Sequence, residues 1–316
     1  MRIVIMGSGG VGGVLGLHMQ NAGHDVAFVA RGAHLRAMQS DGLRLVSPLG
    51  TVHVPVHAVE TPEEAGAADL IVVAVKYYDL EAVAMALRPM VRNGAVVVPL
   101  LNGVEAQGIL AEHLGSTAVA AGVARIGAVV SAPGVLSQST PFADFMVGPL
   151  EGSQEAVLRN FVGGFPAGEG ISLAYSDAIV VEQWKKLCFL APFSALTTIT
   201  RSPIGVPRGT AETAELFWAA IGEGVAVGRA MGVRLPARIE ETLWSFILGL
   251  PSGMKSSMLE DLERGKRLEL PWLSGALVRL GRTVGVATPV NAFVCAALAP
   301  FVGGKNASTP TPVAAE

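Results

Sequence analysis

The chain has 316 residues, of which 51% are hydrophobic and 16% charged, and its formal net charge is −3. That length accommodates two domains with separate cores. The weakly acidic balance, with no basic run, argues against nucleic acid or an anionic membrane as a partner. The two cysteines, Cys188 and Cys295, form no CxxC pair. We therefore expect a cytoplasmic protein whose thiols are buried and unreactive.

Strands and helices alternate along the first half of the chain. Apolar β runs are predicted at 3–6, 25–30, 70–75 and 95–99, with a small hairpin at 43–54. Helices are predicted at 11–22, 33–40 and 80–90, and further βα material continues to about residue 175. Strands separated by helices of this length indicate βαβ units and a parallel sheet.

The second half of the chain loses the strand pattern from residue 176 onward. Long amphipathic helices are predicted instead, at 177–200, 209–231, 236–248 and 271–284. The uncharged stretch 283–304 contains two prolines, so we interpret it as a loop and a buried helix at 290–298, with no membrane span. The last dozen residues, 305–316, have a composition typical of a disordered tail.

A glycine-rich motif follows the first strand directly and opens the first helix. It consists of Gly7, Ser8, Gly9, Gly10, Val11 and Gly12. At this place in a βαβ unit, Gly7 permits a tight turn, Gly9 lets a pyrophosphate approach the backbone, and Gly12 lets the helix pack on the strand. The helix N-terminus would then face the phosphates. The alternative is a plain glycine-rich turn.

The whole pattern predicts a fold of two parts. An N-terminal Rossmann-like dinucleotide-binding domain (1–175) is followed by an all-α helical domain (176–304), with a ligand cleft between them.

The residue after the second strand decides which dinucleotide is expected. In NAD-binding folds, a carboxylate there accepts a hydrogen bond from the ribose 2′-OH, but this chain has Arg31. A guanidinium can clamp the 2′-phosphate of NADP(H) in a bidentate way, so we predict NADP(H) as the cofactor. A surface arginine at a strand end is the alternative. His34 could assist, although a solvated histidine on a helix face is the simpler interpretation.

Two later strand ends carry polar residues. Lys76 follows the strand at 70–75, and Asn102 follows the strand at 95–99. Ligands bind at the carboxyl ends of parallel strands in open α/β sheets. Lys76 could therefore meet charge on a cofactor or substrate, and Asn102 could hydrogen-bond to the nicotinamide ribose or substrate. Either residue could equally be an ordinary loop residue.

An ordered set of segments resembles one known family. These segments are 7–12, Ala30-Arg31-Gly32, Val75-Lys76, Asn102-Gly103, Gln183-Trp184-Lys185-Lys186-Leu187 and 256–262. Together they resemble the ketopantoate reductases (2-dehydropantoate 2-reductases) over roughly residues 1–300. The resemblance implies reduction of the C2 ketone of ketopantoate by NADPH. The product would be D-pantoate, a precursor of coenzyme A in pantothenate biosynthesis.

The resemblance also implies roles for individual residues. Lys186 matches the lysine that acts as general acid on the ketone oxygen, and Glu269 matches the glutamate that supports the site. Ser257 matches a substrate-binding serine, while Lys76 and Asn102 match positions that hold cofactor or substrate. No metal is implied. Without the resemblance, Lys186 and Glu269 would be interpreted as solvated helical charges.

Two positions depart from the family pattern. A helix over 177–200 places Lys186, Leu190 and Ser194 on one face, with a bend expected at Pro192. The family pattern has substrate-binding asparagines where this chain has Leu190 and Ser194. A leucine supplies no hydrogen bond, so the pocket is predicted to be more apolar and suited to a hydrophobic or aromatic 2-oxo acid.

Three functions therefore stay open. The first is ketopantoate reduction, and the second is a D-2-hydroxy-acid dehydrogenase for a bulkier or aromatic 2-oxo acid. The third is a non-catalytic NADP-binding sensor or scaffold. A homodimer is also possible through apolar residues of the helical domain, although core burial would explain the same residues. They are Phe217, Trp218, Trp244 and Phe246.

Overall fold

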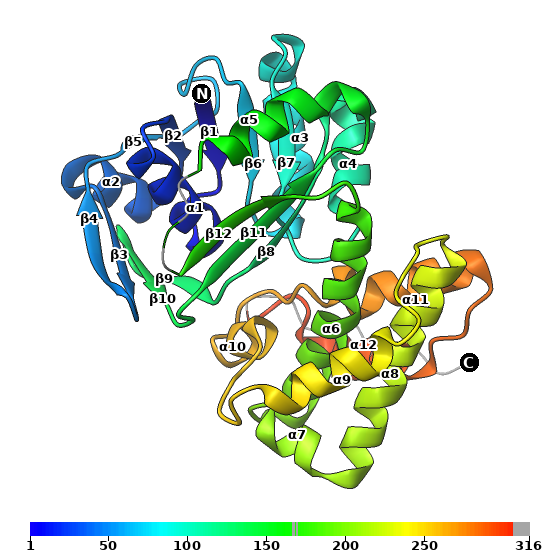
Figure 1. The fold of residues 1–316 in the computed structure, drawn as a ribbon. Helices are drawn as coiled ribbons and strands as arrows, with labels where there is room; N and C mark the ends of the chain where they lie inside the picture. Colours follow the sequence, from blue (N-terminus) through cyan, green and yellow to red (C-terminus); the bar gives the residue numbers. More distant parts are fainter. Residues whose placement is uncertain (166–167, 169, 306–316) are drawn as a thin grey trace, which may run out of the picture. The chain divides into compact units, whose positions relative to one another are not determined.

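The computed structural model describes residues 1–165, 168 and 170–305 (Figure 1). The chain divides into two compact units. The first contains Met1–Leu101 and Glu105–Ile179, and the second contains Asn102–Val104 and Val180–Glu316. The short segment Asn102–Val104 thus groups with the helical unit, although it lies in the first third of the chain. Cutting the sequence at one residue therefore does not describe the two units, because Asn102–Val104 groups with the later one.

A five-stranded parallel sheet forms the centre of the first unit. Its order is β5 (His57–Val59), β2 (Asp25–Val29), β1 (Arg2–Met6), β6 (Leu70–Val73) and β7 (Val96–Pro99). Every neighbouring pair runs parallel. β6 and β7 are buried along their whole length, as their continuous apolar sequences require. The predicted Rossmann-like sheet is confirmed, and its carboxyl edge carries the loops that follow β1, β2 and β6.

The three predicted helices of this unit are present as α1 (Gly10–Asn21), α2 (Gly32–Asp41) and α3 (Leu80–Arg92). Two more, α4 (Ala106–Leu114) and α5 (Glu155–Gly163), lie in the part that was predicted only as further βα material. α3 shows how sequence determines packing, because its buried residues recur at helical spacing. They are Leu80, Val83, Ala84, Leu87 and Met90. The buried face of α3 holds the helix in place after β6.

Two smaller sheets complete the first unit, and the sequence pattern predicted only one hairpin of the first of them. One has the order β4 (Gly50–Val54), β3 (Leu43–Ser47), β10 (Val135–Gln138) and β9 (Ala128–Ala132). The other has the order β12 (Ile171–Tyr175), β11 (Ala143–Gly148) and β8 (Ala121–Arg125). The predicted hairpin is the antiparallel pair β3–β4. Phe28, Leu136 and Phe145 belong to one continuous core, so the three sheets share a single hydrophobic interior.

Helices make up the second unit, and its described residues contain no strand. They are α6 (Ile179–Thr200), α7 (Gly205–Gly209), α8 (Ala211–Ala230), α9 (Ile239–Gly249), α10 (Ser257–Glu263), α11 (Ser274–Val284) and α12 (Pro289–Leu298). α6 begins at the last residue of the first unit and continues for 22 residues through Pro192. The predicted all-α character is confirmed, while α7 and α10 were not predicted.

Some details of the second unit differ from the sequence-based expectations. The helix at 290–298 is not wholly buried, since α12 packs through Asn291, Val294 and Leu298 while Phe293 is 60% exposed. Lys305, expected in the disordered tail, is described, and its N–H donates to the carbonyl of Gly265. The rest of the expected tail, 306–316, lies outside the described residues. No helix in the described part of the chain is long and apolar enough to cross a membrane.

The two cysteines differ in burial, and so do the aromatic residues considered for a dimer interface. Burial raises the pKa of the Cys188 thiol to about 12, as expected for an inert core cysteine, whereas Cys295 is half-buried. Phe217 is fully buried, which favours the core interpretation for it. Trp218 and Phe246 are 43% and 52% exposed. The homodimer stays a prediction.

Candidate functional site

The glycine turn between β1 and α1 has the geometry that its sequence predicts. Gly7 has φ +100°, a conformation that favours glycine. A Cβ at Gly12 would overlap the Gly7 carbonyl, so helix and turn touch directly there. A Cβ at Gly10 would overlap the carbonyl of Ala128 in β9. Gly9 differs from the others, because a Cβ there would enter open space. The space beside the Gly9 backbone is thus clear.

The N-terminus of α1 is suited to an anion. Its N-cap, Gly9, provides no side-chain cap, and its first turn contains no acidic residue. The first in-helix hydrogen bond runs from the Gly13 N–H to the Gly9 carbonyl at 2.7 Å. The N–H groups of Gly10, Val11 and Gly12 precede it and have no acceptor within the helix. Together with the clear side at Gly9, this donor set fits a dinucleotide pyrophosphate.

Ser8 and His34 hold this turn in place. The Ser8 side chain is buried, and its Oγ donates to the Val29 carbonyl at 3.0 Å. His34 Nε2 lies 2.9 Å from the Ser8 carbonyl, and His34 Nδ1 accepts the Gly134 N–H at 3.0 Å. The tautomer with hydrogen on Nε2 satisfies both contacts. His34 is therefore a half-buried structural bridge and not the solvated side chain of the simpler interpretation.

Arg31 lies immediately before α2 and is exposed. Its side chain is 71% exposed, and one guanidinium nitrogen lies 3.4 Å from a carboxylate oxygen of Asp79. Asp79 ends the 3₁₀ turn Tyr77–Asp79 that follows β6. Sequence reasoning placed a lone arginine here, and the structure adds a carboxylate from a distant part of the chain.

Lys76 is half-buried at the start of that 3₁₀ turn. Its carbonyl accepts the Asp79 N–H at 2.9 Å, which fixes the turn locally. The next residue, Tyr77, is buried and its hydroxyl accepts the Ala106 N–H at 3.1 Å. The backbone around Lys76 is thus anchored to the first residue of α4. The sequence analysis did not predict a role for Tyr77.

The second unit brings two of the predicted site residues together. Lys186 projects from α6, and its Nζ donates to the amide oxygen of Asn102 at 2.9 Å. Both side chains are half-buried. They are separated by 84 positions in the sequence, so this contact depends on the segment Asn102–Val104 grouping with the helices. An ammonium group has three donors, and the neutral amide oxygen of Asn102 accepts from one of them.

Glu269 and Ser257 occupy different environments in the same unit. Glu269 is only 6% exposed and begins the 3₁₀ turn Leu270–Trp272. Ser257 is exposed as the first residue of α10. The preceding residue, Ser256, is the N-cap: its Oγ accepts the Leu259 N–H and lies 2.7 Å from Thr197 Oγ1. Ser256 and Thr197 thus fasten α10 to α6, which sequence reasoning missed despite the N-cap signal of a serine before the helix.

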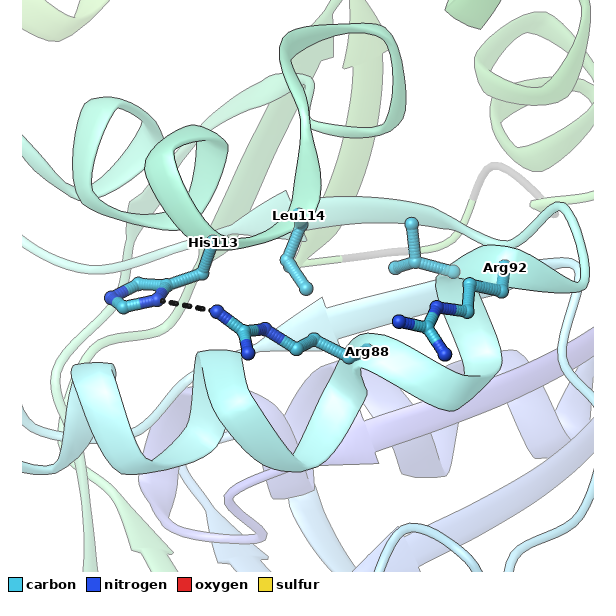
Figure 2. Close-up of a pocket in the computed structure, with 5 residues that line it drawn as sticks. Arg88, Arg92, His113 and Leu114 are labelled. Atoms are coloured by element: carbon cyan, nitrogen blue, oxygen red, sulfur yellow. Dashed lines mark hydrogen bonds between the residues drawn. The ribbon is translucent and has the colours of Figure 1, made fainter.

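A separate hollow lies in the first unit (Figure 2). It measures about 220 Å³ and is lined by Arg88, Val91, Arg92, His113 and Leu114. Arg88 donates to His113 Nδ1 at 3.4 Å, as the dashed line shows. The lining comes from the last turns of α3 and α4, where basic side chains complement the negative ends of the helix dipoles. This hollow is therefore at the edge of the sheet opposite to the glycine turn.

Comparison with known proteins adds an independent finding. The family model described as ketopantoate reductase PanE/ApbA matches residues 3–152, and the model for its C-terminal part matches residues 178–301. The chain belongs to the ketopantoate reductase family. It is an oxidoreductase that acts on CH–OH groups, of the 2-dehydropantoate 2-reductase type.

Full-length relatives support the same assignment. The chain is similar to a 2-dehydropantoate 2-reductase of Archaeoglobus fulgidus, with 33% identity over 92% of this chain and 94% of the relative. It is also similar to the uncharacterized oxidoreductase YkpB of Bacillus subtilis, with 28% identity over 96% and 100% of the two chains. Among solved structures, a PanE/ApbA family ketopantoate reductase from Ralstonia eutropha aligns with a TM-score of 0.85 and 30% identity. That alignment covers 95% of this chain and 98% of the other.

In this chain, the face of α6 that carries Lys186 is apolar. Leu190 is half-buried and packs against the core of the helical unit. Phe189 and Phe193 stack with their ring centroids 5.4 Å apart, and Phe246 of α9 meets Phe189 edge-on at 5.0 Å. Helical spacing places these α6 side chains on the Lys186 side of the helix.

Ser194 has no exposed surface, and its Oγ has no partner among the described residues. A buried hydroxyl without a partner is uncommon in native proteins. It is the second of the two positions at which the expected amide is replaced.

Proposed function

We propose that the protein reduces a 2-oxo acid to a D-2-hydroxy acid with NADPH, and that its substrate is ketopantoate (2-dehydropantoate), which gives D-pantoate for pantothenate biosynthesis. The observation that carries the proposal is the hydrogen bond from Lys186 Nζ to Asn102 Oδ1. It sets a proton donor in one orientation, and it pairs the lysine that the resemblance implies as general acid with an asparagine implied to hold cofactor or substrate.

The cofactor part of the proposal rests on the first unit. A bound NADPH supplies a hydride to the C2 carbonyl carbon of the substrate. The N–H groups at the start of α1 bind the pyrophosphate, and Gly9 leaves room for it. Arg31 binds the 2′-phosphate, for which a guanidinium is well suited. Lys76 complements the negative charge of cofactor or substrate from the loop after β6.

The substrate part of the proposal assigns a proton path. When the C2 carbon becomes tetrahedral, negative charge develops on its oxygen, and the Lys186 ammonium stabilises that charge and transfers a proton to it. Asn102 keeps the ammonium oriented through its amide oxygen. Glu269, whose carboxylate is buried, supports this site, as the family resemblance implies. Ser257 is exposed at the start of α10 and binds the substrate through its hydroxyl.

Steady-state kinetics on a panel of 2-oxo acids tests the proposal. We expect NADPH-dependent turnover of ketopantoate with a kcat/KM at least about tenfold above that for phenylpyruvate or benzoylformate. Absence of turnover with every 2-oxo acid, together with tight NADPH binding, would instead support a non-catalytic NADP-binding sensor.

A second substrate class is favoured by one feature of α6. Leu190 and the cluster of Phe189, Phe193 and Phe246 give the Lys186 side of the helix an apolar surface. Such a surface favours a hydrophobic or aromatic tail over the hydroxyl of ketopantoate, because a buried hydroxyl without a partner is costly. A D-2-hydroxy-acid dehydrogenase of this kind would turn over phenylpyruvate or benzoylformate in the panel and leave ketopantoate unreacted.

A further inference from the structure

The ion pair between Arg31 and Asp79 lies at the glycine turn. Arg31 follows β2 by two residues, and Asp79 follows β6 by six. The sheet order places β1 between these two strands, with the turn that begins at Gly7 at its carboxyl end. The contact of 3.4 Å between Arg31 and Asp79 therefore spans the carboxyl end of β1. A carboxylate thus stands beside the residue that is proposed to read the 2′ position of the cofactor.

We propose that Asp79 sets the balance between NADPH and NADH, an inference that rests on the proposed dinucleotide function. The carboxylate that NAD-binding Rossmann folds carry at the end of the second strand is missing from this chain. Asp79 supplies one from the loop after β6. Its carboxylate can accept a hydrogen bond from the ribose 2′-OH of NADH, while Arg31 can bind the 2′-phosphate of NADPH. The pair therefore gives the site a partner for each cofactor.

The charges determine the direction of the effect. A phosphate that hydrogen-bonds to the Arg31 guanidinium lies within roughly 6 Å of the Asp79 carboxylate, given the usual length of such bonds. The two anions repel each other, and the side chain of Asp79 is 35% exposed, so solvent only partly screens them. The exposed ion pair itself is weak, so it offsets little of this repulsion. Asp79 thus opposes NADPH and favours NADH.

Asp79→Asn tests this role, because it removes the charge and keeps the size of the side chain. We expect the Kd for NADPH to fall about tenfold and the Kd for NADH to rise about threefold, since a charged acceptor is replaced by a neutral one. Isothermal titration calorimetry on the full chain without any 2-oxo acid measures both constants. The matched control is Glu81→Gln, which removes an exposed carboxylate from the first turn of α3.

Three outcomes would overturn the proposal. The ratio of the two Kd values could stay within twofold of the original protein, or Glu81→Gln could shift it as much as Asp79→Asn does. NADPH binding could also weaken, which would show that Asp79 orients Arg31 for the phosphate. The binding assay needs no substrate, so failure of 2-oxo acid reduction is detected separately. Arg31→Ala tests the proposed NADPH preference itself.

Discussion

The glycine turn and the Lys186 face of α6 are built in opposite ways. The residues that form the turn are neighbours in the sequence, and its geometry follows from backbone rules that apply to any chain. The contact between Lys186 and Asn102 joins positions 84 residues apart, and it depends on a three-residue segment that groups with the helical unit. A local motif is therefore readable from the sequence, whereas a site assembled from distant segments needs a family resemblance or a structure.

The largest expected effect comes from removing the proposed proton donor, which tests the site that is assembled from distant segments. We expect Lys186→Ala to lower kcat by at least about 100-fold, the usual contribution of a positioned general acid, with little change in the Kd for the dinucleotide. Steady-state and binding measurements check both parts. Lys185→Ala is the matched control, because Lys185 pairs with Glu182 one turn back on the same helix. Near-normal turnover of Lys186→Ala would remove this residue from the mechanism.

A smaller effect is expected at the cofactor side. Arg31→Ala should raise the Kd for NADPH by about 30-fold, because a bidentate contact to a doubly charged phosphate is lost. The Kd for NADH should change by less than about threefold, since NADH lacks that phosphate. Fluorescence titration with each cofactor measures the two constants. If both cofactors weaken equally, Arg31 does not bind the 2′-phosphate.

How far the sequence predicts the molecule depends on the range of the interaction. The parallel sheet and the long helices follow from hydrophobic periodicity, and they are present within a few residues of their predicted bounds. Only the β3–β4 hairpin of the small sheets was predicted, and its sheet was missed because β3 pairs with β10 from a segment about 90 residues later in the chain. For the same reason, the sequence does not predict the ion pair between Arg31 and Asp79, which joins two distant segments. Periodicity reports which face is buried and does not report which distant strand or carboxylate lies opposite.

His34 sharpens the comparison from the other direction, because it is a residue outside the local motif that supports the glycine turn through long-range contacts. Its ring joins the Ser8 carbonyl to the N–H of Gly134, 100 positions away, in the turn between β9 and β10. His34→Ala leaves both groups without this partner, a loss of about 1 kcal/mol in a half-buried site. We expect the Kd for NADPH and NADH to rise by the same factor, about fivefold, since the turn loosens for either cofactor.

The matched variants separate a bridge from a ligand. His34→Gln keeps one donor and one acceptor, so we expect it to recover most of the affinity that His34→Ala loses. His53→Ala removes another histidine of this unit, one that contacts the Asp41 carbonyl at the exposed side of β4, and it should leave both constants unchanged. If His34→Ala weakens the binding of NADPH alone, the ring contacts the 2′-phosphate, which would contradict the bridge role. Equal weakening instead shows that the glycine turn depends on a residue that the motif does not contain.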